Sequence, residues 1–303
     1  MTFQQKYQKI LNLVQEEIEL VLENLTKGIE LQNPLKSKLL GLLNAPAKHI
    51  RPLVSFLYLK ASGIKIDDAQ ILYQSAIELV HNASLIHDDV IDESAYRRGL
   101  ETLNSQFGNK LAVIAGDYLL SLALDKVLKI GSFELVEMFR ETLEVMSTGE
   151  INQHFSKYKI PTIEEYIQKS EQKTAKLFET ALCGSLLIAN LSSPLPLGEG
   201  AVVRAERVTT AGEGLSFARN FGLAFQIRDD LINCKTSKSD INDGIYTAPV
   251  IFSGGTENIQ TGIEKTQILL NNTIENALKC IEHFEDCKYK TALQELLELL
   301  KNG

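Results

Sequence analysis

Residues 86–93 read IHDDVIDE, which places four carboxylates within six residues at the end of a long apolar run. The apolar residues upstream recur with a helical period, so Asp88 and Asp92 are expected on one helix face, about 6 Å apart along the axis. Carboxylates this close repel each other, and the dipole at a helix C-terminus disfavours them further. Bound cations would offset both effects, so the stretch predicts a metal-binding helix end. The alternative is an acidic helix end in contact with solvent.

A second acidic cluster closes another apolar helical run, at residues 225–233, which read FQIRDDLIN. Its polar residues Gln226, Asp229, Asp230 and Asn233 follow the i, i+3, i+4, i+7 spacing of one helix face. Two such helices facing each other would form a carboxylate-lined mouth on an apolar cavity. Oxygen ligands without histidine or cysteine suit Mg²⁺, which keeps several waters and binds a few carboxylates plus substrate phosphates. Together the two clusters predict a magnesium site.

The composition indicates a globular chain with a large core. Of the 303 residues, 44% are hydrophobic, and no break in composition separates two halves, so we expect a single domain over residues 1–303. The formal net charge of −8 argues against a nucleic-acid partner. A polyanionic ligand would therefore need a local cluster of basic side chains and metal ions.

The sequence also argues against export and against a membrane span. Its four cysteines form no CxxC pair, so neither a zinc site nor a disulfide framework is expected. The first residues lack the apolar core of a secretory signal. The most apolar window, residues 111–128, is interrupted by Asp117 and Asp125. We therefore expect a cytoplasmic protein.

Helical periodicity recurs along the chain, whereas convincing period-two runs are scarce. The expected helices cover residues 3–32, 34–44, 52–61, 67–92, 102–130, 133–157, 163–190, 215–233, 258–283 and 288–301. The expected fold class is therefore all-α, a large helix bundle with its ligand site among facing helices. Residues 192–214 hold two prolines and four glycines, which predicts a flexible surface insertion loop or, alternatively, a functional lid.

With both acidic clusters placed, the chain resembles the trans-polyprenyl diphosphate synthases, whose DDxxD motif is matched by residues 88–92. Further matching segments are Lys48-His49-Ile50-Arg51-Pro52 (GGKRxRP), Glu78-Leu79-Val80-His81 (ELxH), Arg97-Arg98-Gly99 (RRG), Gly116-Asp117 (GD), Lys173-Thr174 (KT) and Phe225-Gln226 (FQ). The resemblance runs from about residue 10 to the end, apart from residues 192–214. It implies an isoprenoid synthase fold with a central apolar cavity, and a homodimer.

The activity implied by the resemblance is a magnesium-dependent prenyl transfer. An allylic diphosphate primer loses pyrophosphate to give a carbocation, isopentenyl diphosphate attacks it head to tail, and the chain grows to an all-trans polyprenyl diphosphate. The barrier is mostly charge building on the leaving group, which divalent metals stabilise. By the resemblance, about three Mg²⁺ ions are held by Asp88, Asp92, Asp229 and Asp230.

The resemblance also assigns residues to the two substrates, because Arg and Lys suit phosphate oxygens. The residues implied for the allylic diphosphate are Arg97, Lys173, Thr174, Gln226 and Lys235. Those implied for isopentenyl diphosphate are Lys48, Arg51, His81 and Arg98. The implied catalytic set is Asp88, Asp92, Arg97, Lys173 and Asp229. Taken singly, His81 is also explained as a hydrogen-bonded core histidine, and Arg97 and Arg98 as partners of nearby acids.

The residues that precede the first acidic cluster bear on product length. In the family, an aromatic side chain four or five positions before the first aspartate plugs the hydrocarbon tunnel. Here those positions hold Ser84 and Ala83, both small and both expected on the helix face one turn below Asp88. We therefore predict a product longer than twenty carbons. The alternative is that the two small residues only allow close helix packing.

Some family positions are altered in this chain, and these leave other functions open. Pro46 and Ala47 replace two glycines, His49 replaces an arginine, Asn233 replaces the last aspartate of the second motif, and Ile245 replaces a later lysine. Asn233 still offers an oxygen ligand, but with one charge fewer. A regulatory or binding subunit without turnover is one alternative. A class I terpene cyclase is another, although its NDxxSxxxE motif is not apparent.

Overall fold

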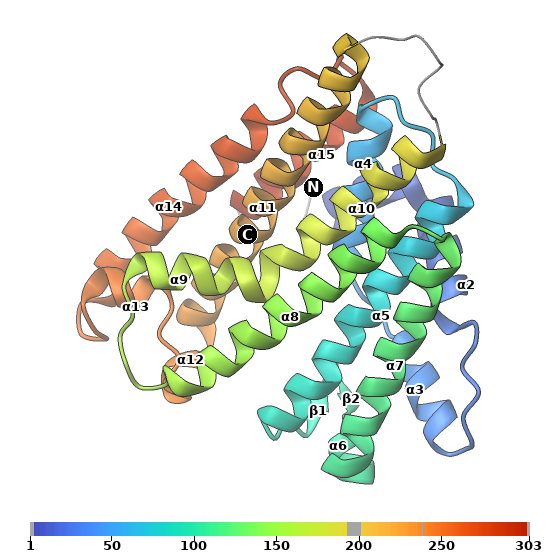
Figure 1. Cartoon of the computed structure of the whole chain (residues 1–303). Coiled ribbons are helices and arrows are strands. Elements are labelled where there is room, and N and C mark those ends of the chain that lie inside the picture. Colours follow the sequence, from blue (N-terminus) through green and yellow to red (C-terminus); the bar gives the residue numbers. More distant parts are fainter. Residues whose placement is uncertain (1–2, 193–200, 238, 302–303) are drawn as a thin grey trace.

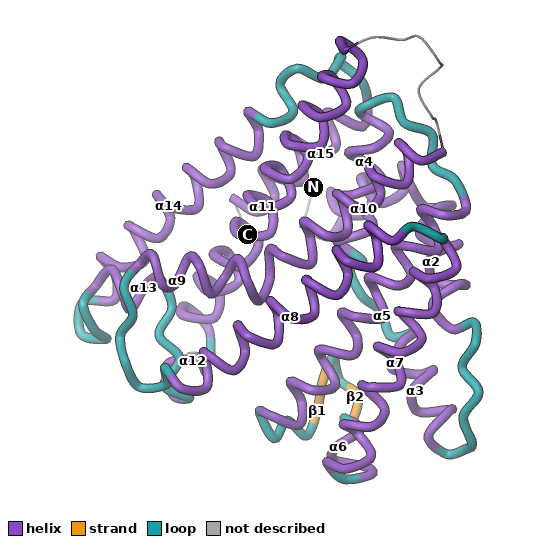
Figure 2. The backbone as a smooth tube through the Cα atoms, viewed as in Figure 1, coloured by secondary structure: helices purple, strands orange, loops and turns teal. Residues whose placement is uncertain are grey.

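Helices make up almost all of the regular structure in the computed structural model, which describes residues 3–192, 201–237 and 239–301 (Figure 2). The α-helices are α1 Phe3–Leu11, α2 Gln15–Thr26, α3 Leu35–Leu43, α4 Ile50–Ala61, α5 Asp68–Ile91, α6 Leu103–Phe107, α7 Asn109–Ile130, α8 Phe133–Phe155, α9 Ile163–Ser170, α10 Lys176–Ser192, α11 Ala201–Thr236, α12 Ser239–Asn242, α13 Ala248–Ser253, α14 Ile259–Lys279 and α15 Lys288–Lys301. The shorter elements are the 3₁₀ turn η1 Asn12–Val14, the π-helical turn η2 Glu171–Ala175, and the strands β1 Tyr96–Arg97 and β2 Leu100–Glu101. The predicted all-α fold class is confirmed.

The acidic clusters lie at the ends of two long helices, α5 and α11. Helix α5 starts behind a capping box, in which Asp67 accepts from the backbone N–H of Gln70 while the Gln70 side chain accepts from that of Asp67. Both helices run from the upper to the lower part of the view in Figure 1. Their acidic ends therefore lie at the same end of the bundle.

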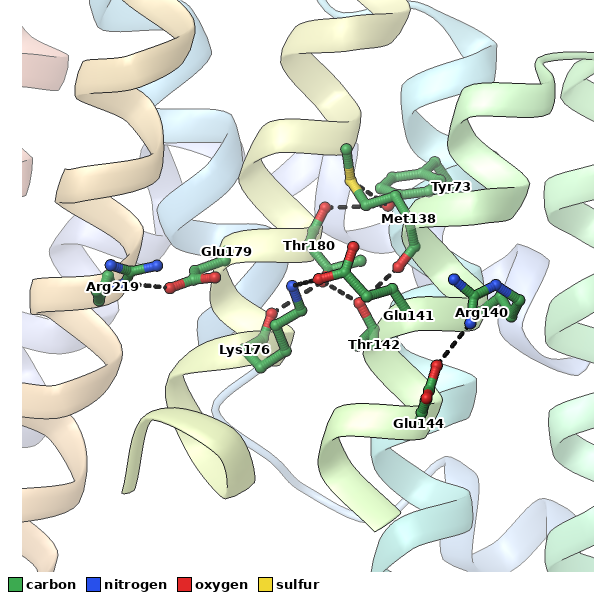
Figure 3. A network of polar contacts seen from close by, with 10 residues as sticks. All are labelled: Tyr73, Met138, Arg140, Glu141, Thr142, Glu144, Lys176, Glu179, Thr180 and Arg219. Carbon is green, nitrogen blue, oxygen red and sulfur yellow. Dashed lines mark hydrogen bonds and ion pairs between the residues drawn. The ribbon is translucent and has the colours of Figure 1, made fainter. Parts of the chain in front are cut away.

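Helix α10 packs against both α5 and α11, and polar contacts fasten it in place (Figure 3). The Tyr73 hydroxyl of α5 donates to the carbonyl of Thr180 at 3.0 Å. The Thr180 hydroxyl lies 2.5 Å from that of Thr142 on α8. On the other side, Arg219 of α11 donates to Glu179 at 2.6 Å. These contacts fix the spacing of the helices that carry the site.

Two clusters of buried apolar side chains form the core. One lies among α4, α11, α14 and α15 and includes Phe217 and Phe221, and the other lies among α5, α7 and their neighbours and includes Leu79 and Leu119. Fully burying a side chain of this size stabilises the fold by roughly 1.5–3 kcal/mol. The apolar run that precedes each acidic cluster thus packs into this core. None of the described helices is both long and apolar enough to cross a membrane.

The predicted loop at residues 192–214 was wrong over most of its length. Ser192 is the last residue of α10, and residues 201–214 form the start of α11, while residues 193–200 lie outside the described part of the chain. Gly214 is buried, and a Cβ atom there would lie 2.5 Å from Leu186. This glycine therefore allows two helices to approach closely, whereas the sequence pattern had suggested a chain break.

Three of the predicted helices are divided in the structure, and one of them, residues 163–190, forms α9, η2 and the first part of α10. Residues 3–32 form α1, η1 and α2, and helix ends at Thr26, shortly before Gly28 with its φ of +89°. Residues 102–130 are divided by Gly108, whose φ of +81° no α-helix contains. The β1–β2 hairpin and helices α12 and α13 were not predicted, because each is too short to show a period.

Close packing of α11 on η2 gives a prediction for stability. A Cβ atom at Gly222 would lie 2.6 Å from the Ala175 Cα atom, so Gly222→Ala is expected to lower the free energy of unfolding by ~1–3 kcal/mol through overpacking. The matched control is Gly41→Ala in α3, where a Cβ meets nothing within 4 Å; it should raise stability by ~0.5–1 kcal/mol. Urea denaturation measures both, and equal effects would contradict the packing account.

Candidate active site

The acidic end of α5 lies beside an ion pair formed by Glu150 of α8 and Lys173 of η2, with Oε2 and Nζ 2.6 Å apart. Burial raises the pKa of Asp88 to about 6; Lys173 opposes this rise, and the carboxylates of Glu150 and Asp92 add to it. Three carboxylates thus repel one another around a single ammonium group. This arrangement attracts a further cation.

Lys173 and Thr174 belong to the π-helical turn η2, between α9 and α10. A π turn changes the direction of the side chains that follow it, and such turns are frequent at functional sites. Lys173 points to Glu150 and the α5 end, whereas the Thr174 hydroxyl donates to Gln226 of α11 at 2.5 Å. The two predicted residues therefore connect η2 to both helices that carry acidic clusters.

The two neighbouring aspartates of α11 have different surroundings. Asp229 is half-buried, 3.0 Å from Arg228, and burial is the main cause that raises its pKa. Asp230 is fully buried, and it accepts hydrogen bonds from the Tyr166 hydroxyl at 2.6 Å and the Gln226 amide at 2.7 Å. Burial raises the pKa of Asp230 to about 7. Asp229 is therefore the available ligand, whereas both oxygens of Asp230 already accept hydrogen bonds from the protein.

At the end of α11, Asn233 and Lys235 have different surroundings. The Asn233 side chain hydrogen-bonds to Asp240 of α12, so the amide found in place of an aspartate ties α12 to the end of α11. Lys235 is exposed in the last turn of α11, roughly 120° around the helix from Asp229. Lys235 therefore lies on a different face of α11 from Asp229, and its assignment to the allylic diphosphate stays a prediction.

Two lysines connect the acidic ends of α5 and α11. Lys173 interacts electrostatically with Asp88 of α5 and with Asp240, which follows α11. Lys169 of α9 interacts with Asp240, with Asp230 of α11 and with Lys173. The two acidic clusters therefore face a common pair of ammonium groups, as expected for helix ends that converge on one site.

A basic pocket of about 390 Å³ adjoins the acidic ends. The basic residues that line it are Lys48, His49, Arg51, His81 and Arg98, so the structure brings together all four residues assigned to isopentenyl diphosphate. Buried Glu78 lies among them, with its Oε2 2.9 Å from His49 Nδ1. A pocket with this excess of positive charge is suited to a polyanion.

The electrostatic state of the pocket also favours an anionic ligand. Burial lowers the pKa of Arg51 to about 10, and Glu78 opposes this shift. Burial, together with Arg51 and Arg98, holds the pKa of His81 well below its usual range, so His81 is neutral at pH 7. It can therefore accept or donate a hydrogen bond without adding to the charge repulsion.

The β1–β2 hairpin directs the side chains of the adjacent residues Arg97 and Arg98 to different partners. Strands β1 and β2 pair Arg97 with Leu100, and the turn residues Arg98 and Gly99 have positive φ values of +51° and +77°, as tight two-residue hairpin turns require. Arg97 donates to Asp89 at 2.6 Å, while Arg98 lines the basic pocket. Arg97 thus forms an ion pair with the first acidic cluster, whereas Arg98 faces the basic pocket.

The N-terminal helix α1 contributes aromatic contacts that the sequence did not suggest. The Phe3 ring lies 5.7 Å from the Lys48 ammonium and 5.2 Å from the Arg228 guanidinium, within the range of cation–π attraction. The Tyr7 hydroxyl donates to the Lys48 carbonyl at 2.5 Å. Helix α1 therefore positions a cation of the basic pocket and the arginine beside Asp229.

The two positions that the sequence assigns to chain length do not face the same way. Ala83 is fully buried and lies one turn before His87, which contacts the Val113 carbonyl of α7 at 3.2 Å. Ala83 therefore faces α7. Ser84 is half-buried one turn before Asp88. Only Ser84 shares the face of Asp88 on which both were expected.

Comparison with known proteins agrees with this geometry. The polyprenyl synthetase family model matches residues 32–288. The chain belongs to the polyprenyl synthetase family. A prenyl transferase of Cyanophora paradoxa is 30% identical over 94% of this chain and 95% of its own, and octaprenyl diphosphate synthase of Escherichia coli (strain K12) is 31% identical over 77% and 69%.

The fold agrees as well. A polyprenyl synthase from Caulobacter crescentus CB15, solved with calcium and isoprenyl diphosphate, superimposes with a TM-score of 0.83, at 21% identity, over 98% of each chain. The predicted family and the isoprenoid synthase fold are therefore confirmed, and the chain is a trans-prenyltransferase.

The carboxylates at the ends of α5 and α11 suit a hard divalent cation. Among the described residues, no three His, Cys, Asp or Glu side chains are close enough to hold a metal ion by themselves. Asp88, Asp92 and Asp229 nevertheless offer oxygen ligands next to repelling charges. A Mg²⁺ ion keeps several waters and binds through substrate phosphates, so a polyprenyl synthetase site of this kind needs no complete protein cage.

Several residues of this polyprenyl synthetase site escaped the sequence analysis. Glu150 pairs with Lys173, Tyr166 with Asp230, and Lys169 lies between the acidic ends. Each meets its partner across helices far apart in the sequence, so no local spacing indicates the contact. For Tyr7 and Phe3, the only signal was an amphipathic helix, which fits any helix at the surface.

The buried contact of Asp230 gives a second prediction for stability. Tyr166→Phe removes the donor to a carboxylate oxygen that is buried, so it should lower the free energy of unfolding by ~1–3 kcal/mol at pH 8. Tyr96→Phe in β1, at a side chain that is 73% exposed, should change it by less than ~0.5 kcal/mol. Chemical denaturation followed by circular dichroism compares the two. If Tyr166→Phe left the free energy of unfolding unchanged, the hydrogen bond would contribute little to stability.

Proposed function

We propose that this protein condenses isopentenyl diphosphate with an allylic diphosphate in a Mg²⁺-dependent, head-to-tail elongation that yields a long-chain all-trans polyprenyl diphosphate. The observation that carries the proposal is the convergence of the α5 and α11 acidic ends on Lys169 and Lys173, beside a separate basic pocket. One position has carboxylates that would bind a diphosphate through metal ions, and the other has basic side chains that would bind a diphosphate directly. Two such positions suit two diphosphate substrates. The calcium and isoprenyl diphosphate in the Caulobacter structure support the same assignment.

The chemistry follows from this division of the site. Bound Mg²⁺ at Asp88, Asp92 and Asp229 would supply positive charge to the leaving diphosphate. Lys173 adds a fixed charge beside Asp88, and Thr174 and Gln226 offer hydrogen bonds. The allylic C–O bond breaks and its electron pair leaves with the diphosphate. The double bond of isopentenyl diphosphate then forms the new C–C bond, and the proton that is lost passes to the departing pyrophosphate.

The basic pocket would hold isopentenyl diphosphate without metal. Arg51, Arg98 and Lys48 offer the positive charge, and neutral His81 offers a hydrogen bond. The Arg51 Nε is buried without a hydrogen-bond partner in the described part of the chain. A phosphate oxygen would satisfy this donor, because a buried group left unpaired costs about 1–3 kcal/mol.

The central test is an elongation assay with labelled isopentenyl diphosphate, an allylic primer and Mg²⁺. The wild type should give linear polyprenyl products, and Asp88→Asn should lower kcat by about 10²–10³, because one carboxylate that supports the charged transition state is lost. Asp286→Asn, at a side chain that is 99% exposed and pairs with Lys290, should leave kcat unchanged. Cyclic hydrocarbon would indicate a cyclase instead, and activity only with an added partner chain would indicate a regulatory subunit.

Product length tests the role of Ser84. Ser84→Phe places an aromatic ring on the Asp88 face of α5, so we expect shorter products than the wild type, whose products should exceed twenty carbons. Ser84→Ala should leave the distribution unchanged. Ala83→Phe should instead destabilise the α5–α7 contact, since Ala83 is fully buried toward α7. Chromatography of the alcohols released by phosphatase measures the product lengths. An unchanged distribution for Ser84→Phe would show that Ser84 does not line the part of the site that limits chain growth.

We further propose that the enzyme is a homodimer through α7. Ile114, Leu124 and Leu128 recur at helical spacing along one face of α7, and they are 52%, 40% and 56% exposed. An apolar stripe of this kind is suited to a second copy of the same helix. Ile114→Glu should weaken association at least ~10-fold, as measured by light scattering, whereas Ile268→Glu, which is 59% exposed on α14, should remain dimeric. A dimer that tolerates Ile114→Glu would exclude this face.

A further inference from the structure

A pocket of about 430 Å³ lies where the end of α8, helix α9 and the segment before α13 meet. This volume falls within the range of roughly 300–1,000 Å³ that is usual for ligand sites. None of the residues assigned above to the two substrates or to the metal lines it. Its basic residues are Lys157, Lys159 and Lys169, and we call it the lysine pocket.

The walls of the lysine pocket are fixed by backbone contacts. The Tyr158 N–H donates to the Gly244 carbonyl at 2.8 Å, and the Ile245 N–H donates to the Asp240 carbonyl at 2.7 Å. Gly244 has a φ of +72°, and a Cβ atom there would lie 2.5 Å from the Tyr158 ring. The loop that carries Lys157 is therefore held against the segment after α12, so the pocket exists before a ligand enters.

The charge in the lysine pocket is unbalanced. Glu165 is its one acidic lining residue, and that carboxylate already accepts from the Thr162 N–H in the capping box of α9. Within the described ranges, no carboxylate lies within ion-pair distance of Lys157, Lys159 or Lys169. Among these lysines, the charge of Lys169 is partly offset by Asp230, Asp240 and Glu150. The two loop lysines, Lys157 and Lys159, therefore supply the positive charge that attracts a compact polyanion.

Lys169 joins the lysine pocket to the acidic ends. It lines the pocket, and it also interacts electrostatically with Asp230, Asp240 and Glu150. On the far side, Lys173 lies beside Asp88 and Asp92. Lys173 and Lys169, each with carboxylates beside it, thus link the Asp88 end of α5 to the lysine pocket.

We propose that the lysine pocket binds the inorganic pyrophosphate that each condensation releases, an inference that rests on the proposed function. Breaking the allylic C–O bond leaves a pyrophosphate that bound Mg²⁺ and Lys173 would hold beside the carboxylates of α5 and α11. It must leave before the lengthened substrate can ionise there, and transfer to Lys157 and Lys159 of the lysine pocket frees the site. The diphosphate group of a prenyl substrate shares this chemistry, so the two sources must be separated by experiment.

The test measures binding without turnover. The full chain is titrated calorimetrically with inorganic pyrophosphate and, separately, with a thio-linked prenyl diphosphate that cannot ionise. Lys157→Gln/Lys159→Gln should weaken pyrophosphate binding by about tenfold or more and leave the prenyl analogue unaffected. The charge-matched control is Lys265→Gln/Lys279→Gln on α14, at exposed positions, which should bind both ligands as the wild type does. Lys157→Arg/Lys159→Arg should keep pyrophosphate binding.

The outcomes separate the pocket from the activity. If the glutamine pair binds pyrophosphate as tightly as the wild type, or if the wild type does not bind it, the proposal is overturned. Equal loss of the prenyl analogue would make the pocket a substrate headgroup site and would also overturn it. If the elongation assay fails while the binding pattern holds, the pocket is a pyrophosphate site and only the proposed function is wrong.

Discussion

Repulsion between like charges at two helix ends is the constraint on which the rest of this structure depends. Asp88, Asp92 and Glu150 would be unfavourable together without Lys173, whose ammonium pairs with Glu150 at 2.6 Å. The long apolar runs of α5 and α11 hold the acidic ends in this position, because moving either helix would expose part of the core. The stability of the bundle thus maintains an arrangement that is electrostatically unfavourable by itself, as is common at functional sites.

The sequence was sufficient to predict the features that depend on the residues of a single helix. Helical period and acidic spacing indicated the all-α class, the faces of α5 and α11, and the positions of Asp88 and Asp229. The motif resemblance then grouped Lys48, Arg51, His81 and Arg98, and the structure places these in one pocket. Each of these inferences used residues that are close in sequence or that belong to a family pattern.

The features that escaped prediction depend on contacts between helices. Asp229 and Asp230 look equivalent in the sequence, yet only the second reaches Tyr166 and becomes buried. Gly214 was interpreted as part of a loop, whereas its role is to allow Leu186 to approach. Ala83 and Ser84 are adjacent in the sequence, but successive residues of a helix point in different directions, so Ala83 faces α7 and Ser84 does not. A single sequence carries no direct signal for contacts between segments that are far apart along the chain.

The position of Phe3 has a practical consequence for work with this enzyme. Its ring lies against Lys48 and Arg228, so the first described residue contacts a cation of the basic pocket and the arginine beside Asp229. An affinity tag or fluorescent fusion joined ahead of α1 would begin close to both cations.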